Sequence, residues 1–196
     1  MTTTIDPDTR SALLLIDLQE DFLAAPGLRE QRDDLLTAVR GWIDWASATG
    51  SPVVEIRTVL PLDEETWALN MRDDMQPVVL EGTPGSWRVH ELEVEPDVEI
   101  QKRRDDAFHR TDLAQRLSDL GVGQVVLAGV STEACIAMTA ASAYAHDLRV
   151  VVARDAVASA DSTAHEAALV WLEEQYRAPA LTPAEWGRDS SETSES

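Results

Sequence analysis

The chain has 196 residues, of which 44% are hydrophobic, and its formal net charge at pH 7 is -20. This length and composition suit one domain with a substantial core. The negative charge argues against nucleic-acid and anionic-membrane partners, because binding to phosphates needs clusters of Lys and Arg.

The sequence has a single cysteine, which excludes an intrachain disulfide framework. Residues 1–17 lack the basic start of a secretory signal, and no apolar run approaches the roughly 20 residues of a membrane-spanning helix. We therefore expect a soluble cytoplasmic protein without a membrane partner. Residues 1–187 should form one domain, and residues 188–196, which are all polar, should be a disordered tail.

The first 58 residues indicate a strand, a long helix and a second strand. Residues 12–16 form a continuous apolar run that ends at Asp17, as in a parallel strand buried on both faces. Residues 29–49 carry apolar side chains at helical spacing, and Gly50 ends the helix. Residues 52–58 are the second strand. This βαβ unit places Asp17 at the carboxyl end of the first strand.

Residues 59–95 have no clear periodicity apart from a possible short helix around residues 64–71. A connection of this length is usually a functional loop, and we expect it to form one wall of a pocket.

Strands and helices alternate through the rest of the chain. A short strand over residues 98–101 leads to Lys102, the only lysine. Further strands are expected over residues 124–128, 148–153 and 179–181, and helices over residues 111–120, 133–145 and 161–176. This alternation predicts an α/β fold: a doubly wound, mostly parallel sheet of about six strands with helices on both faces, a three-layer sandwich.

Three reactive side chains follow strands of this sheet. Asp17, Lys102 and Cys135 should meet at its carboxyl edge, where such folds bind ligands. They could act as base, cation and nucleophile. A helix N-terminus and a nearby cation can lower the pKa of a thiol, which favours Cys135 as the nucleophile. The alternatives are that Cys135 is a small buried hydrophobic residue and that the single lysine reflects an arginine-rich composition.

Three segments of the chain resemble, in order, three motifs of the isochorismatase-like cysteine hydrolases. They are Leu13-Leu-Leu-Ile-Asp-Leu-Gln-Glu-Asp-Phe22, Gln101-Lys-Arg-Arg-Asp-Asp-Ala-Phe-His-Arg-Thr-Asp-Leu113 and Ala128-Gly-Val-Ser-Thr-Glu-Ala-Cys135. Gly82-Thr-Pro-Gly-Ser86 and Arg154-Asp-Ala156 are also similar to family segments, so the resemblance covers residues 12–181.

The resemblance implies a role for each matching residue. Asp17 corresponds to the catalytic aspartate, Lys102 to the catalytic lysine, and Cys135 to the nucleophile of the amidase branch. It also implies a cis peptide bond between Val130 and Ser131, with the N–H groups of Ser131 and Cys135 as an oxyanion hole. The expected reaction is hydrolysis of a small-molecule amide or related carbon–nitrogen bond through a thioester acyl-enzyme. Family members are commonly dimers or tetramers, so a homodimer or homotetramer is expected.

The chain departs from the nicotinamidase branch, which binds a metal through an Asp-x-His motif after its second strand. Residues 57–67, the corresponding segment, contain no histidine. We therefore expect no metal and no cofactor, and nicotinamide is a less favoured substrate. Hydrolysis of the vinyl ether of isochorismate is an alternative activity, although the presence of Cys135 favours an amidase. A catalytically silent binding module is a further alternative.

Aromatic residues near the strand ends are candidates for the wall of a substrate pocket. They are Phe22, Trp67 and Phe108. For Phe22 and Phe108 the alternative is packing in the core. Trp67 lies on the long connection and is the stronger candidate for a specificity residue.

Overall fold

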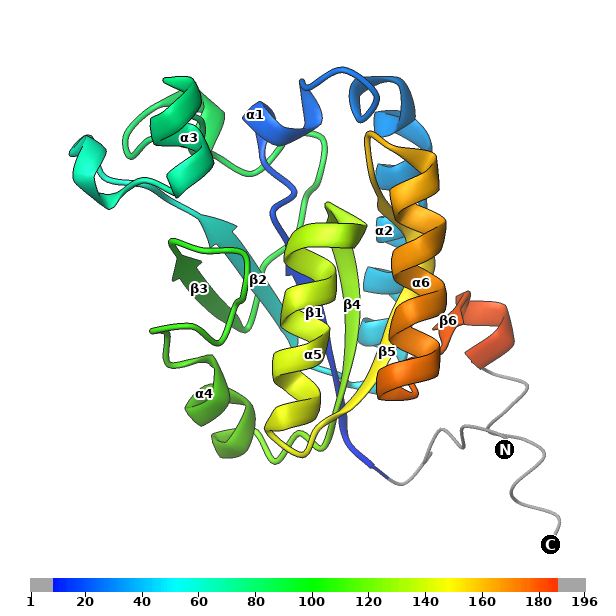
Figure 1. Ribbon diagram of the computed structural model, residues 1–196. Helices are drawn as coiled ribbons and strands as arrows, with labels where there is room; N and C mark the ends of the chain where they lie inside the picture. The colour runs from blue at the N-terminus through cyan, green and yellow to red at the C-terminus, as the bar shows by residue number, and fades with distance from the viewer. Residues whose placement is uncertain (1–8, 187–196) are drawn as a thin grey trace, which may run out of the picture.

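The computed structural model describes residues 9–186 and is built on a six-stranded sheet (Figure 1). The strand order is β3-β2-β1-β4-β5-β6, and every neighbouring pair is parallel. The strands are β1 (Ser11–Ile16), β2 (Val53–Thr58), β3 (Val98–Lys102), β4 (Gln124–Val130), β5 (Arg149–Ala158) and β6 (Ala180–Leu181). The predicted α/β doubly wound sheet is confirmed. The tail expected over residues 188–196 lies outside the described residues.

The α-helices follow the strands in the alternation that the sequence predicts. They are α1 (Glu20–Leu23), α2 (Arg32–Thr49), α3 (Leu69–Asp74), α4 (Leu113–Asp119), α5 (Ala137–Ala145) and α6 (Ser162–Tyr176). Short 3-10 turns are η1 (Arg29–Gln31), η2 (Glu64–Thr66) and η3 (Pro84–Ser86), and one π-helical turn, η4 (Thr132–Ile136), leads directly into α5. No helix within residues 9–186 has the length and apolar character needed to cross a membrane.

The sheet is covered on both faces, and β1 contributes to both halves of the core. Leu14 and Ile16 pack in one cluster with residues of α4, α5 and α6, while Leu13 and Leu15 pack in the other with α2. In Figure 1, α4 and α5 lie in front of the sheet and α2 behind it. All six residues of β1 are buried, which explains why this strand is a continuous apolar run.

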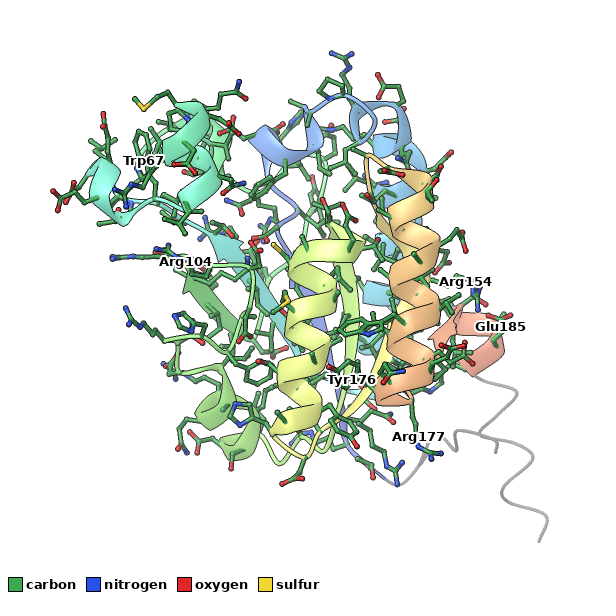
Figure 2. All side chains as sticks on the ribbon, viewed as in Figure 1. Trp67, Arg104, Arg154, Tyr176, Arg177 and Glu185 are labelled. Atoms are coloured by element: carbon green, nitrogen blue, oxygen red, sulfur yellow. The ribbon has the colours of Figure 1, made fainter. Side chains whose placement is uncertain are left out.

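Strand β5 continues past the charged pair at which the sequence suggested its end. Its pairing with β4 shifts register between Leu127 and Gly129 and then resumes. Both charged side chains have partners: Arg154 donates to the carbonyl of Ala180 (Figure 2), and Asp155 accepts from the indole of Trp42. Both residues are exposed and lie where the β4–β5 register shifts, so the strand continues through them without burying a charge.

The connection between β2 and β3 carries η2, α3 and η3 and has a small core of its own. Leu60, Trp67 and Val79 form a separate hydrophobic cluster. Asp21 of α1 fastens this connection, because its carboxylate accepts a hydrogen bond of 2.7 Å from the backbone N–H of Val79. The connection therefore packs as a small substructure above the ends of β2 and β3 (Figure 1).

Candidate active site

Asp17 lies directly after β1 and is fully buried. Its φ of 54° is in the left-handed region, which an aspartate tolerates better than most residues. One carboxylate oxygen accepts hydrogen bonds from the N–H (2.8 Å) and the hydroxyl (2.9 Å) of Thr58, and the other accepts from Lys102 Nζ at 2.7 Å. Three donors from β2 and β3 thus fix this carboxylate.

Lys102 ends β3, where its backbone pairs in register with Thr58 of β2. Its side chain is fully buried. The ammonium group donates to Asp17, to Thr58 Oγ1 at 2.7 Å and to Cys135 Sγ at 3.4 Å, which uses all three of its hydrogens. Burial is the largest single effect on Lys102 and opposes its charge, but the attraction of Asp17 and Cys135 and the hydrogen bonds to them together outweigh burial and raise the lysine pKa above its usual value. The group is therefore an ammonium ion at neutral pH.

Gln19 supports this arrangement from the turn that follows β1 and is also fully buried. Its side-chain nitrogen donates to the carbonyls of Thr58 and Ser86, and its oxygen accepts from the N–H of Thr58 at 2.9 Å. The amide therefore joins the end of β2 to η3. Sequence reasoning missed Gln19 and Thr58, although Gln19 lies two residues after Asp17 within a quoted motif.

Cys135 reaches the same edge from β4. Gly129 has a φ of 130°, and a Cβ atom there would collide with the carbonyl of Ile16 on β1. Only glycine allows this close approach, which brings η4 next to the end of β1. The Val130–Ser131 peptide bond is cis. Cys135 lies in the π-helical turn that follows and is 8% exposed.

The resting thiol of Cys135 is neutral. Burial and the negative charge of Asp17 raise its pKa well above the usual value, the charge of Asp105 adds to this, and the charge of Lys102 opposes it only in part. This pKa shift is opposite in direction to the one that a helix N-terminus and a cation alone would produce. The sequence left the direction of this pKa shift open, and in the resting site burial and two carboxylates outweigh one ammonium.

Asp105 contributes a second carboxylate to the site. The Cys135 thiol donates toward Asp105 Oδ1 at a distance of 3.8 Å. Asp105 belongs to the loop between β3 and α4, and it is exposed, in contrast to Asp17. The sequence analysis did not single out Asp105, although it lies three residues after Lys102 within the family-like segment of residues 101–113.

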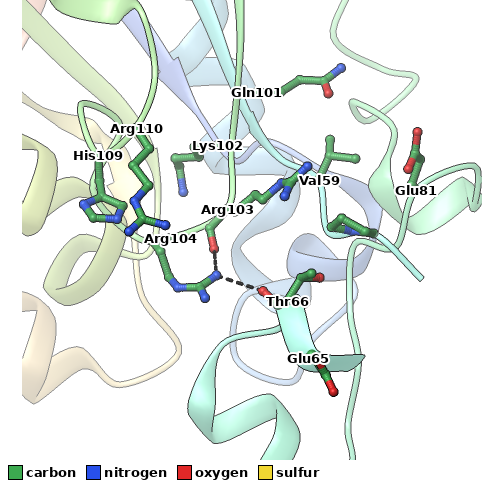
Figure 3. Close-up of a pocket in the computed structure, with 11 residues that line it drawn as sticks. Val59, Glu65, Thr66, Glu81, Gln101, Lys102, Arg103, Arg104, His109 and Arg110 are labelled. Carbon is green, nitrogen blue, oxygen red and sulfur yellow. Dashed lines mark hydrogen bonds between the residues drawn. The ribbon is translucent and has the colours of Figure 1, made fainter. Parts of the chain in front are cut away.

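A pocket of about 600 Å³ opens beside Lys102, between the β3–α4 loop and the β2–β3 connection (Figure 3). One wall is basic and the opposite one carries two acidic residues. The basic residues are Arg103, Arg104, His109 and Arg110, and the acidic ones are Glu65 and Glu81. The guanidinium group of Arg104 donates to the carbonyl of Thr66 at 3.1 Å, so it joins the two walls.

The three aromatic residues proposed for the pocket wall lie elsewhere in the structure, and none lines this pocket. Phe108 is 9% exposed and stacks on His146 with ring centroids 4.8 Å apart. Phe22 packs between two hydrophobic clusters. Trp67, which lies on the β2–β3 connection (Figure 2), donates to the carbonyl of Pro61 and lines a smaller cavity of about 300 Å³. A role of these rings in substrate binding stays a prediction.

Within residues 9–186, one group of three side chains has the spacing of metal ligands: Glu20, His90 and Glu91. The guanidinium of Arg32 already bridges the two carboxylates, with contacts of 2.9 Å to Glu20 and 2.7 Å to Glu91. A metal cation at this position would be repelled by the positive charge of Arg32. Asp17, Lys102 and Cys135 do not fit a metal either, because the ammonium group occupies the space between the carboxylate and the thiol.

Comparison with known proteins agrees with this geometry. A family model described as the isochorismatase domain matches residues 11–185. Streptothricin hydrolase of Streptomyces noursei is 32% identical over 155 residues, which cover 76% of this chain but 55% of that protein. Nicotinamidase 3 of Arabidopsis thaliana is 31% identical over 175 residues, covering 85% of this chain and 83% of the relative. The crystal structure of the pyrazinamidase of Pyrococcus horikoshii in complex with zinc has a TM-score of 0.77 and 28% identity, covering 88% of this chain and 99% of that one.

Proposed function

This chain belongs to the isochorismatase family of hydrolases, and we propose that it cleaves a small-molecule amide or a related carbon–nitrogen bond with Cys135 as nucleophile. One observation carries the proposal: the only thiol of the sequence lies 3.4 Å from a buried ammonium group that is itself paired with a carboxylate. The activity for which relatives such as nicotinamidase 3 are named supports the choice of bond.

In the acylation step, Asp17 takes the thiol proton while Sγ bonds to the substrate carbonyl carbon. Lys102 keeps its proton and stabilises the developing thiolate across 3.4 Å. The carbonyl oxygen becomes an oxyanion, for which we propose the N–H groups of Ser131 and Cys135 as donors. Within residues 9–186 the Ser131 N–H has no backbone acceptor, so it is available for this role.

Collapse of the tetrahedral intermediate breaks the carbon–nitrogen bond. The proton held by Asp17 passes to the leaving nitrogen, which departs as ammonia or an amine, and a thioester remains on Cys135. In the second half-reaction water attacks the thioester and gives a proton to Asp17. That proton returns to sulfur as the acid product leaves, so the resting thiol and carboxylate are restored.

The basic wall of the pocket supports an acyl group that carries a negative charge. The chain has 16 basic residues against 36 acidic ones, yet four of the 16 lie within residues 102–110. The guanidinium groups of Arg103, Arg104 and Arg110 make no ion pair with a carboxylate in the part of the chain that is described. They could therefore bind a carboxylate or phosphate of the substrate.

A screen of primary amides, ureido compounds and isochorismate against wild type and Cys135→Ala tests the proposal. Wild type should hydrolyse amides and the variant should not, with the fold checked by circular dichroism. Amide turnover that survives in Cys135→Ala would contradict the role of the thiol. Turnover of isochorismate alone, unaffected by the substitution, would favour vinyl ether hydrolysis instead.

Two further expectations belong to this proposal. A small-molecule hydrolase of this kind is expected in the cytoplasm. A homodimer or homotetramer is expected from the resemblance to the family, and sedimentation of the purified protein would measure its mass in solution.

A further inference from the structure

Asp105 is a carboxylate beside the nucleophile for which the reaction above has no role. We propose that Asp105 forms the subsite of the leaving nitrogen and so makes the enzyme selective for amides over esters of the same acid. The inference rests on the proposed function, because the subsite would bind the nitrogen of the amide that this reaction cleaves.

The distance between Sγ and Oδ1 fits this role. A carbonyl carbon bonded to Cys135 Sγ carries its nitrogen one bond further away, and the 3.8 Å between Sγ and Asp105 Oδ1 leaves room for that nitrogen. An N–H···O hydrogen bond spans about 2.9 Å. The leaving nitrogen can thus donate to Asp105 while the carbon is bonded to sulfur. In the resting site the thiol hydrogen bond already runs from Sγ towards this carboxylate.

The backbone around Asp105 is held on both sides. The carbonyl of Asp105 accepts from Thr139 Oγ1 at 3.5 Å, and the same hydroxyl accepts from the N–H of Ala107 at 3.1 Å. The carboxylate of Asp106 accepts from Ser142 at 2.7 Å and from the N–H of Phe108 at 2.8 Å. These contacts fasten the β3–α4 loop to α5, so the position of Asp105 is set before substrate binds.

The side chain of Asp105 is in a different situation from its backbone. Among residues 9–186, the Cys135 thiol is the only group that donates to its carboxylate. Asp105 Oδ2 is therefore available to a substrate N–H group, and Oδ1 becomes available once the thiol proton has moved to Asp17. Because the residue is exposed, the same carboxylate faces the solvent into which the ammonia or amine leaves.

The chemistry of the leaving step gives the selectivity. When the proton from Asp17 reaches the leaving nitrogen, that nitrogen is positively charged until the carbon–nitrogen bond breaks. A carboxylate within hydrogen-bond reach stabilises this charge. The leaving oxygen of an ester carries no N–H and no such charge, so an ester gains nothing from Asp105.

A competing explanation is that Asp105 only tunes the thiol. Its negative charge helps to raise the pKa of Cys135, so removal of the charge should increase the thiolate fraction. Under this explanation Asp105→Asn would react faster with iodoacetamide and would cleave amides and esters equally fast or faster. Under the leaving-group role, amide turnover falls while the alkylation rate does not.

The test compares wild type with Asp105→Asn and Asp105→Ser, with Asp147→Asn as the matched control. Asp147 is exposed and has a φ of 60°, which asparagine tolerates, so the control removes one surface charge without disturbing the backbone. The substrates are the best primary amide of the screen and the methyl ester of the same acid, each measured as kcat/KM. Cys135 alkylation by iodoacetamide at pH 7 is followed in parallel by mass spectrometry.

Loss of one charge-assisted hydrogen bond should lower kcat/KM for the amide by about 10- to 100-fold in both Asp105 variants. Ester kcat/KM should stay within about twofold, and alkylation should be unchanged or faster. An equal loss on amide and ester, or an unchanged amide rate, overturns the inference while leaving the proposed function intact. If wild type cleaves no amide at all, the proposed function itself fails.

Discussion

Replacing Asp17 by asparagine should make Cys135 more reactive towards alkylation while abolishing turnover. In the wild-type site the charge of Lys102 is balanced by Asp17 at 2.7 Å, and a thiolate would add an uncompensated buried charge. The substitution leaves the ammonium without a carboxylate. The thiolate of Cys135 then becomes its counter-ion, so the pKa of the thiol should fall.

The size of the effect follows from the repulsion between Asp17 and the thiolate, which the substitution removes. Both groups contact Lys102 Nζ, at 2.7 and 3.4 Å, so they lie no more than about 6 Å apart, and two unit charges at that distance interact by about 3 kcal/mol at an effective dielectric constant of about 20. One pKa unit corresponds to about 1.4 kcal/mol, so even half of this energy lowers the thiol pKa by about one unit. Below the pKa, each unit increases the thiolate fraction, and with it the alkylation rate, about tenfold.

The assay is simple because the chain has one cysteine. Pseudo-first-order alkylation by iodoacetamide is measured from about pH 6 to about pH 10 for wild type, Asp17→Asn and the surface control Asp147→Asn. The wild-type rate should rise only above the range of a free thiol, whose pKa is about 8.5. The profile of Asp17→Asn should be displaced to lower pH, and that of the control should match wild type.

The same variant should be less stable. Removing one partner of a buried ion pair costs about 3 to 5 kcal/mol, part of which the new thiolate–ammonium pair recovers. Urea denaturation measures this free energy. If folded Asp17→Asn is alkylated no faster than wild type at pH 7, the carboxylate does not hold the thiol in its neutral form, and the electrostatic reasoning is refuted.

Two other substitutions test the frame of the site. Gly129→Ala should destabilise the protein by several kcal/mol or prevent folding. The new Cβ would collide with the carbonyl of Ile16, and a φ of 130° is strained for alanine. Thermal unfolding measures the loss of stability. Arg104→Gln should raise KM for anionic amides by about tenfold, with little change for neutral amides, because one ion pair to the substrate is lost. Equal effects on both kinds of amide would contradict the proposal that the basic wall of the pocket binds an anionic substrate.

The fold could be predicted from sequence because its strands are buried on both faces. The six residues of β1 have no solvent-facing position, so the apolar run itself defines the strand, and Gly50 in the left-handed conformation ends α2 as expected. The end of β5 could not be predicted. Arg154 and Asp155 look like a turn until their partners, Ala180 and Trp42, are known, and both partners are distant in sequence.

The site could be predicted only as far as strand ends locate it. Asp17 and Cys135 follow strands and Lys102 ends one, and topology brings strand ends together. Asp105 lies in a loop whose position depends on hydrogen bonds to α5, and no periodicity encodes such contacts. The direction of the thiol pKa shift was equally inaccessible, because it depends on the balance between burial and three neighbouring charges.

That balance also explains why the thiol can be unreactive at rest and still serve as a nucleophile. The buried pair of Asp17 and Lys102 has no net charge, so loss of the Cys135 proton to solvent would leave the cluster negative and buried. Transfer of the same proton to Asp17 leaves the net charge of the cluster unchanged, because the charges of a neutral acid, an ammonium and a thiolate again sum to zero. The low-polarity site therefore favours internal proton transfer over ionisation. Asp105 is exposed, and its charge is screened by solvent, so it can bind a cationic leaving group without disturbing this buried neutrality.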